Sequence, residues 1–294
     1  MLLGTQTDYL FQKVSEEEGI RMLAQAGFDA IDYSMFPMKN DNSFLNTVDC
    51  EAHAKRLRTV AEEEGICFHQ AHAPFPSLRV GDDEYNAKMP GRIARAVKLA
   101  GLLGAKTIVV HPVYFPCSEE EKMERNLAMY RALEPVALEY GIKVALENMW
   151  GRDPKRGYII PNVCSLAKEL AAYYDELNPD AFTVCLDLGH CGLVGEEAPD
   201  AIRVLGSRRI GALHVHDNNY KEDTHTLPYT YGCSMNWEEI TKALGEIDYQ
   251  GDFTFEADNF IERYEGEALL SAHKHMAEVG RTLMKKIDAH RPQK

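Results

Sequence analysis

The feature that most limits the fold of this chain of 294 residues is a regular alternation of two hydrophobic patterns. Short runs rich in β-branched and aromatic residues alternate with longer stretches in which apolar residues recur at helical spacing. The short runs predict eight strands, at residues 2–4, 28–33, 66–71, 107–111, 143–147, 183–187, 210–214 and 253–256.

The stretches between the strands predict eight amphipathic helices. The first begins after Ser15, which forms a capping box with Glu18, and ends before Gly27. The other helices are expected at about 50–64, 88–103, 118–140, 163–175, 198–207, 236–246 and 266–286. The last of them carries His273 and is rich in Lys and Glu, so we expect a solvated outer helix there.

Strict alternation of eight strands with eight helices predicts an α/β fold, a closed parallel (β/α)8 TIM barrel. A doubly wound open sheet is the alternative fold. No linker, low-complexity tract or domain boundary interrupts the pattern, so residues 1–294 are expected to form a single TIM barrel domain.

Composition limits the location and the partners of the chain. It has 46 acidic and 32 basic side chains, and the formal net charge of −14 disfavours nucleic acid and anionic membrane surfaces as partners. The seven cysteines include no Cys-x-x-Cys pair, and their odd number argues against a disulfide framework. The sequence shows no signal peptide and no apolar stretch that could cross a bilayer. We therefore expect a cytoplasmic protein with reduced thiols.

Ionisable side chains gather where the last six predicted strands end. Burying such groups in a parallel sheet costs free energy, so their positions carry information. They are His72, His111, Glu147, Asp187, His190, His214, His216 and Glu256. One histidine at a strand end is more often a hydrogen-bonded structural group than a ligand. Their recurrence on successive strands favours one shared site on the C-terminal rim, where barrel enzymes carry their active sites.

Alternation along the strands sharpens this interpretation. Glu147 shares a face with Ala145, whereas Leu146 faces the other way. His214 and His216 likewise share a face. We expect bulky apolar residues to pack outward against the helices and polar ones to face the lumen. Imidazole and carboxylate ligands together suit Mn or Zn, with Co and Fe as further options, so the rim predicts a divalent metal site.

Four short motifs at these residues resemble those of one known superfamily. They are LEN around Glu147, LDLGH around Asp187, HVHDN from His214 and DTH from Asp223. Over nearly its whole length the chain resembles the xylose isomerase-like TIM barrel superfamily of sugar phosphate isomerases and epimerases. That superfamily includes tagatose-epimerase-like enzymes and is related to endonuclease IV.

The resemblance implies two different ligand sets. In the tagatose-epimerase-like branch, one metal ion is held by residues that match Glu147, Asp187, His214 and Glu256, and the match to His190 contacts substrate. In the endonuclease IV branch, three zinc ions are held by nine residues. The matching positions here are His72, His111, Glu147, Asp187, His190, His214, Asp223, His225 and Glu256. We therefore expect substrate-binding groups or additional metal ligands at His72, His111, His190, His216, Asp223 and His225.

Two departures from the epimerase branch leave the substrate open. That branch has an arginine shortly after the histidine of strand seven, whereas this chain has the stretch NNYKED, with Lys221 as the nearest cation. A second glutamate of that branch is roughly replaced by Asp153.

The leading functional hypothesis is isomerisation or epimerisation of a small sugar or sugar phosphate through an enediolate stabilised by the metal. Glu147 and Glu256 are the predicted catalytic pair, one removing a carbon-bound proton and the other returning it. Phe75, Tyr114 and Trp150 are expected to wall the pocket. The loop GRDPKRG at 151–157 is either a phosphate clamp or, as we favour, a solvated surface loop.

Other functions stay open on this scaffold. One is an inosose dehydratase-like lyase, and another is a non-catalytic sugar-binding barrel, which the presence of both glutamates disfavours. The third is a zinc-dependent abasic-site endonuclease of the endonuclease IV type. The nine matching residues support this function, whereas the acidic net charge and the lack of an Arg-rich run argue against it. The expected partner is a small-molecule sugar, and related barrels also form homo-oligomers through outer helices or rim loops.

Overall fold

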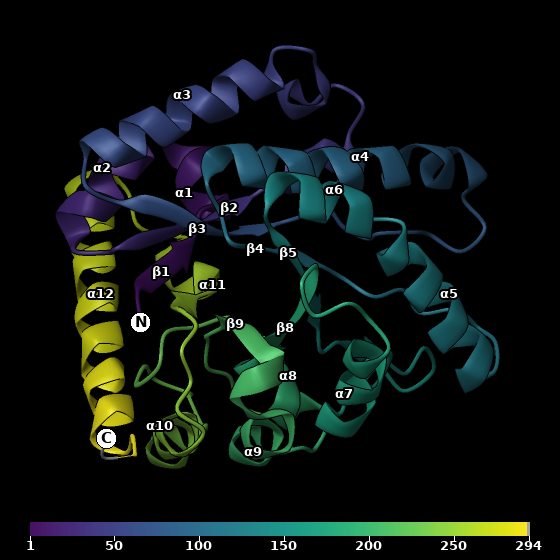
Figure 1. Cartoon of the computed structure of the whole chain (residues 1–294). Coiled ribbons are helices and arrows are strands. Elements are labelled where there is room, and N and C mark those ends of the chain that lie inside the picture. Colours follow the sequence, from purple (N-terminus) through teal and green to yellow (C-terminus); the bar gives the residue numbers. More distant parts are fainter. Residues whose placement is uncertain (293–294) are drawn as a thin grey trace.

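The computed structural model describes residues 1–292 and is built around one sheet of eight parallel strands (Figure 1). Their order in the sheet is β10-β1-β2-β3-β4-β5-β8-β9. The strands are β1 (Leu3–Gln6), β2 (Ala30–Ser34), β3 (Cys67–His72), β4 (Thr107–Val110), β5 (Lys143–Glu147), β8 (Phe182–Asp187), β9 (Ile210–His214) and β10 (Phe253–Phe255). Each overlaps one of the strands that the hydrophobic pattern predicted, so these predictions are confirmed.

The first and last strands of that order meet and close the barrel. The Val215 backbone N–H donates to the Thr254 carbonyl at 2.9 Å, and the Glu256 N–H donates to the Val215 carbonyl at 3.0 Å. Val215 and Phe255 thus form a parallel bridge just beyond the end of β9. The predicted TIM barrel is confirmed, and the open-sheet alternative is wrong.

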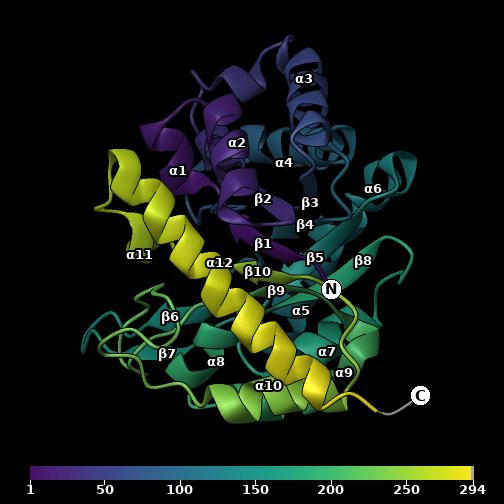
Figure 2. The ribbon, with the colours of Figure 1, turned by 90° about the vertical axis from the view of Figure 1, so that its left-hand side faces the viewer.

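Helices surround the strands (Figure 2). They are α1 (Asp8–Lys13), α2 (Glu16–Ala26), α3 (Cys50–Glu63), α4 (Asp83–Leu103), α5 (Glu119–Arg131), α6 (Glu134–Tyr140), α7 (Ala167–Asp175), α8 (Leu188–Leu193), α9 (Ala198–Arg209), α10 (Trp237–Glu246), α11 (Asp258–Ile261) and α12 (Gly266–Ala289), with 3-10 turns η1 (Phe36–Lys39) and η2 (Phe44–Asn46). The Ser15 hydroxyl accepts from the Glu18 N–H at 3.3 Å, and Gly27 ends α2 with a φ of 98°, as predicted.

No helix within residues 1–292 is long and apolar enough to cross a membrane.

Two predicted helices have different boundaries in the structure. The stretch 118–140 is divided into α5 and α6 because of Pro135. Proline lacks the backbone N–H that a continuous helix would need at this position, whereas in the first turn of a new helix that N–H has no partner to lose. Helix α4 begins at Asp83 rather than near 88. The Asp82 carboxylate accepts from the Tyr85 N–H at 3.1 Å, an N-cap that lies ahead of the apolar pattern.

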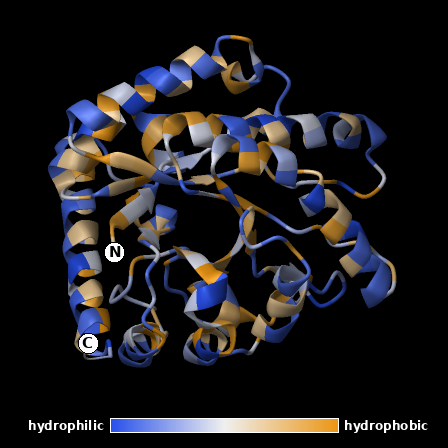
Figure 3. Ribbon diagram, in the orientation of Figure 1, coloured by the Kyte–Doolittle hydropathy of each residue, from blue (hydrophilic) through white to orange (hydrophobic). Residues whose placement is uncertain are grey.

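The last helix lies on the outside of the barrel, as predicted, but one side of it is buried. Helix α12 crosses the outside of β1 and β10 (Figure 2). His273 on its inner side is 0% exposed, and its Nδ1 lies 2.8 Å from the Leu269 carbonyl oxygen. Figure 3 shows hydrophobic residues interleaved with hydrophilic ones along the outer helices. The Lys and Glu residues of α12 cover its outer face, so the predicted solvated outer helix is correct for that face and wrong for His273.

A short hairpin in the β5–α7 connection was not predicted. It pairs β6 (Trp150–Arg152) with β7 (Ile159–Pro161) in antiparallel register. At its tip the Asp153 carboxylate accepts from the backbone N–H groups of Lys155 and Arg156, at 2.9 and 2.7 Å. The hairpin brings Trp150 to the rim of the barrel.

Small residues occupy the barrel lumen. A separate buried apolar cluster consists of Val109, Ala145, Cys185 and Ala212. Their bulky strand neighbours Val144, Leu146 and Leu213 belong instead to the main core between strands and helices. This confirms the predicted division into an outward apolar face and an inward face with small residues. Above this narrow plug the lumen accommodates polar side chains.

The close fit of α12 on the barrel gives a prediction with a matched control. An added Cβ at Gly280 would lie 2.5 Å from Leu3 Cδ1 and 2.8 Å from Phe255 Cε2. Gly280→Ala should therefore lower the free energy of unfolding by about 1–3 kcal/mol through overpacking. Gly91→Ala in α4, where nothing lies within 4 Å, should raise it by about 0.5–1 kcal/mol. Urea unfolding measures both, and equal effects of the two variants would contradict this packing.

Candidate metal centre

Four side chains with metal-binding atoms meet at the C-terminal end of the barrel. Glu147 ends β5, Asp187 ends β8, His214 ends β9 and Glu256 follows β10. Each is at most 8% exposed, and one ligand atom of each lies within 4.8 Å of the others. The structure brings together the quartet that the resemblance implied, from four separate strands.

His214 lies at the centre of this quartet. Its Nδ1 is 2.7 Å from Glu147 Oε1 and 3.1 Å from Glu256 Oε2. Asp187 Oδ2 lies 4.0 Å from the same nitrogen. Three buried carboxylates around one imidazole leave an excess of negative charge, which costs free energy unless a cation balances it. The donor set and its spacing therefore fit a divalent metal ion.

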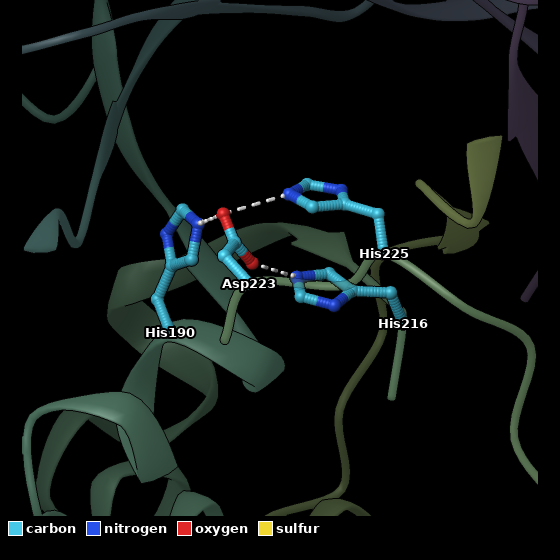
Figure 4. A group of neighbouring side chains, drawn as sticks. All are labelled: His190, His216, Asp223 and His225. Carbon is cyan, nitrogen blue, oxygen red and sulfur yellow. Dashed lines mark hydrogen bonds and ion pairs between the residues drawn. The ribbon is translucent and has the colours of Figure 1, made fainter. Parts of the chain in front are cut away.

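A second group surrounds Asp223, which follows β9 in the chain (Figure 4). One carboxylate oxygen, Oδ2, lies 3.0 Å from His225 Nε2 and 3.4 Å from His190 Nε2. The other, Oδ1, lies 3.8 Å from His216 Nε2. Figure 4 shows the three imidazoles directed at this carboxylate. Metal-competent atoms thus also converge beside the quartet.

A third group joins His72 and His111 to Glu147. The two Nε2 atoms lie 3.0 Å apart. Glu147 Oε2 lies 2.8 Å from His111 Nε2 and 3.7 Å from His72 Nε2. Because Glu147 faces His214 with Oε1 and these histidines with Oε2, the first and third groups share one carboxylate.

His216 contacts the quartet through Asp187. It is fully buried, and its Nε2 lies 3.0 and 3.1 Å from the two oxygens of Asp187. Its ring stacks on His225 with centres 4.0 Å apart. Gly189 makes room for it, since a Cβ there would lie 2.1 Å from His216 Cε1.

Protons compensate the buried carboxylates in the metal-free protein. Burial disfavours the His190 imidazolium, yet the carboxylates of Asp187 and Asp223 outweigh burial and raise the pKa of His190 to about 10. Burial alone would raise the pKa of Asp223, but hydrogen bonds from His190 and His225 hold that pKa far below its usual range. His214 and His111 likewise outweigh burial and hold the pKa of Glu147 well below its usual range. His190 thus forms an imidazolium–carboxylate pair, whereas burial lowers the pKa of His111 despite the neighbouring Glu147.

A cavity of about 600 Å³ opens above these groups. Phe75, Tyr114 and Trp150, the expected pocket wall, all line it. The Trp150 indole N–H donates to Asp223 Oδ2 at 2.9 Å, so the hairpin also fixes that carboxylate. The acidic residues of the lining are Asp8, Glu147, Asp223, Glu256 and Asp258. Among residues 1–292, no Lys or Arg contributes to the lining.

The cationic loop 151–157 lies outside the cavity lining. The Arg152 guanidinium donates to the Gly157 carbonyl at 2.6 Å and to Glu222 at 3.1 Å. The Arg156 side chain is 70% exposed. The geometry favours the solvated surface loop over the phosphate clamp.

A layer of polar side chains on the first three strands was not predicted from the sequence. Gln6, Asp32 and Gln70 are 1%, 0% and 2% exposed. The Gln6 amide donates to Glu256 Oε1 at 2.5 Å, and the Gln70 amide donates to Asp32 Oδ2 at 2.7 Å. A usable signal was present, since a carboxylate inside the predicted strand 28–33 must be buried and needs a partner.

The fold and the site agree with one protein family. Residues 20–278 match the sequence profile of the family described as xylose isomerase-like TIM barrel. The match spans most of the chain, which therefore belongs to this family.

Three relatives illustrate the range of similarity. An uncharacterised protein of Methanocaldococcus jannaschii is 29% identical over 210 residues, which cover 69% of this chain and 68% of that protein. A D-psicose 3-epimerase of Enterocloster bolteae is 24% identical over 239 residues, which cover 76% of this chain and 71% of that enzyme. The crystal structure of D-psicose 3-epimerase with D-tagatose from Clostridium cellulolyticum H10 has a TM-score of 0.72 at 19% identity, covering 97% of this chain and 99% of that one. At this identity the structural similarity supports the fold.

The raised histidine pKa values predict how metal binding responds to pH. At pH 7 His190, with a pKa of about 10, carries a proton that it would lose if an ion bound at the group around Asp223. Burial opposes protonation of His225 and His214 too, but neighbouring carboxylates raise the pKa of each well above its usual value. Binding of Mn²⁺ or Zn²⁺ should therefore release protons, and the apparent affinity should rise from pH 6 to pH 8. Calorimetry in buffers of different ionisation enthalpy measures this release, and a binding enthalpy independent of buffer would contradict it.

Proposed function

We propose that this chain is a divalent-metal-dependent isomerase or epimerase of a small sugar. The observation that carries the proposal is the position of Glu147 and Glu256, because both belong to the metal quartet and both line the cavity. The two relatives named D-psicose 3-epimerase support the same class of reaction. The mixed carboxylate and imidazole donors favour Mn or Zn, with Co and Fe as further options.

The metal would polarise adjacent carbonyl and hydroxyl oxygens of the sugar and stabilise the negative charge that develops there. Glu147 and Glu256 would transfer the proton, one removing it from carbon and the other returning it. They extend from β5 and from the end of β10, which β8 and β9 separate around the closed barrel, and their ligand atoms lie within 4.8 Å of each other. Contacts with His111 and Gln6 hold the two carboxylates in place. His190, which also lines the cavity, would bind a sugar hydroxyl.

The lining supports an unphosphorylated substrate. It contains five carboxylates and, among the described residues, no lysine or arginine. The lining histidines with raised pKa values, His190 and His225, are already paired with Asp223, so they are poorly placed to compensate a phosphate. Sugar hydroxyls, in contrast, donate hydrogen bonds to carboxylates. Lys39 lies outside the lining, with its Nζ 5.5 Å from the centre of the Phe75 ring. Phe75, Tyr114 and Trp150 would exclude water from the reacting carbon.

Replacing one proton-transfer residue tests this proposal. Glu147→Gln keeps the shape of the side chain and removes its ability to act as a base, so turnover should fall by about 100-fold or more. The assay follows interconversion of free ketoses in D2O and deuterium incorporation at the carbon next to the carbonyl. Glu267→Gln, at the exposed start of α12, is the control and should behave as wild type. Normal turnover by Glu147→Gln would contradict the assignment.

A second candidate, a metal-dependent phosphodiesterase acting at abasic sites, is favoured by one observation. The nine residues that match the endonuclease IV ligands all belong to groups of His, Asp and Glu whose ligand atoms lie within 4.8 Å of one another. Against it stands the acidic lining, which offers a nucleic acid backbone no lysine or arginine within residues 1–292. We therefore rank it below the sugar isomerase.

An abasic-site oligonucleotide separates the two candidates. We expect no cleavage by protein loaded with Zn²⁺ or Mn²⁺ at physiological salt, because the acidic lining repels the phosphate backbone. The measurement is gel separation of a labelled duplex after incubation with equimolar protein. Cleavage that disappears after treatment with a chelator, and in Glu147→Gln, would make the nuclease the better assignment.

A further inference from the structure

We propose that Asp32, anchored by Gln70, is a positioning residue that orients His214 for metal binding. This inference rests on the metal-dependent function proposed above. Asp32 lies on β2 and Gln70 on β3, two strands that contribute nothing to the quartet of β5, β8, β9 and the residue after β10.

The direction of the His214 ring defines which nitrogen needs a partner. Nδ1 faces the quartet carboxylates, so a metal ion held by the quartet would take the lone pair of that nitrogen. A neutral imidazole has one proton, which must then lie on Nε2. Nε2 is buried and has no hydrogen-bond partner among the described residues. Asp32 Oδ2 lies 3.6 Å from it, slightly longer than a hydrogen bond, and is the carboxylate oxygen that faces this nitrogen.

Asp32 has no structural partner that accounts for its charge. It is 0% exposed, and its Oδ1 has no hydrogen-bond partner among the described residues. Its Oδ2 accepts from Gln70, a neutral group. Within residues 1–292, no Lys or Arg forms an ion pair with Asp32. A buried carboxylate without a cation costs free energy, and an imidazole that carries part of a metal ion's charge would compensate it.

A β-bulge between β2 and β3 brings Gln70 opposite Asp32. In the pairing of β2 with β3, Ile31 aligns with Phe68, whereas Asp32 aligns with Gln70. His69 is the extra residue that shifts the register. Bulges beside active sites re-aim side chains, and here the shift puts the Gln70 amide opposite the Asp32 carboxylate.

A carboxylate that accepts the second N–H of a metal-bound histidine fixes the tautomer and makes the other nitrogen a stronger donor. Loss of such a partner weakens metal binding by about 10–100-fold in known sites. Asp32→Asn removes the charge and keeps an oxygen acceptor for Gln70 and His214. We expect it to weaken Co²⁺ binding by about 10-fold and to shift the visible absorption bands of the bound Co²⁺.

The experiment titrates metal-free full-length protein with Co²⁺ in competition with a chromophoric chelator. Asp29→Asn is the control, because Asp29 precedes the same strand β2 but lies at the opposite end of the barrel. There its carboxylate accepts from the Leu3 N–H at 2.9 Å and pairs with Arg281 at 2.7 Å. This variant should lose stability and bind Co²⁺ with the wild-type dissociation constant and spectrum.

Gln70→Leu provides a second variant if Asp32→Asn does not fold. It removes the anchor and leaves the carboxylate, and it should also weaken Co²⁺ binding by about 10-fold. Weaker binding and shifted bands in these variants, with an unchanged control, support the inference. Equal dissociation constants for wild type and Asp32→Asn, or for wild type and Gln70→Leu, overturn it and leave the metal-dependent function standing. A wild-type protein that binds no Co²⁺ overturns the proposed function itself.

Discussion

Three carboxylates, from Glu147, Asp187 and Glu256, surround the imidazole of His214 at the mouth of the barrel, almost excluded from water. Desolvating each carboxylate costs several kcal/mol in free energy unless positive charge compensates it. One imidazolium cannot balance three carboxylates. The surrounding histidines, the raised histidine pKa values and the fit to a divalent cation all follow from this excess of negative charge.

The barrel tolerates such a charged cluster because its apolar core lies away from the cluster. The apolar core lies mainly between strands and helices, and only small residues such as Ala145 and Ala212 plug the lumen. The strand ends then hold their side chains on short, well-paired backbone, which keeps ligand positions fixed. Additional support comes from neighbouring polar groups, including Gln6 on Glu256 and the Trp150 indole on Asp223. These contacts distinguish a prepared site from a random gathering of polar residues.

Much of this arrangement was predictable from sequence, because the signals are local and repeated. The periodic hydrophobic pattern of the strands predicted the barrel. The alternation of Glu147 with Leu146 along one strand predicted which side chains face the lumen. The less local features were missed. The β6–β7 hairpin has strands of three residues, too short for a periodic signal. The pairing of Asp32 with Gln70 depends on a register shift between strands, which no single segment reveals. Burial of His273 depends on which side of α12 meets the barrel.

Anomalous X-ray diffraction at the metal absorption edge, from crystals of protein loaded with Mn²⁺ or Zn²⁺, would locate the ion directly. We expect a peak among Glu147, Asp187, His214 and Glu256, with zinc–ligand distances of about 2.0–2.2 Å. Further peaks at the Asp223 or His111 groups would show how many ions the array holds. A crystal that contains metal only at the surface, with the quartet in its metal-free geometry, would contradict the account.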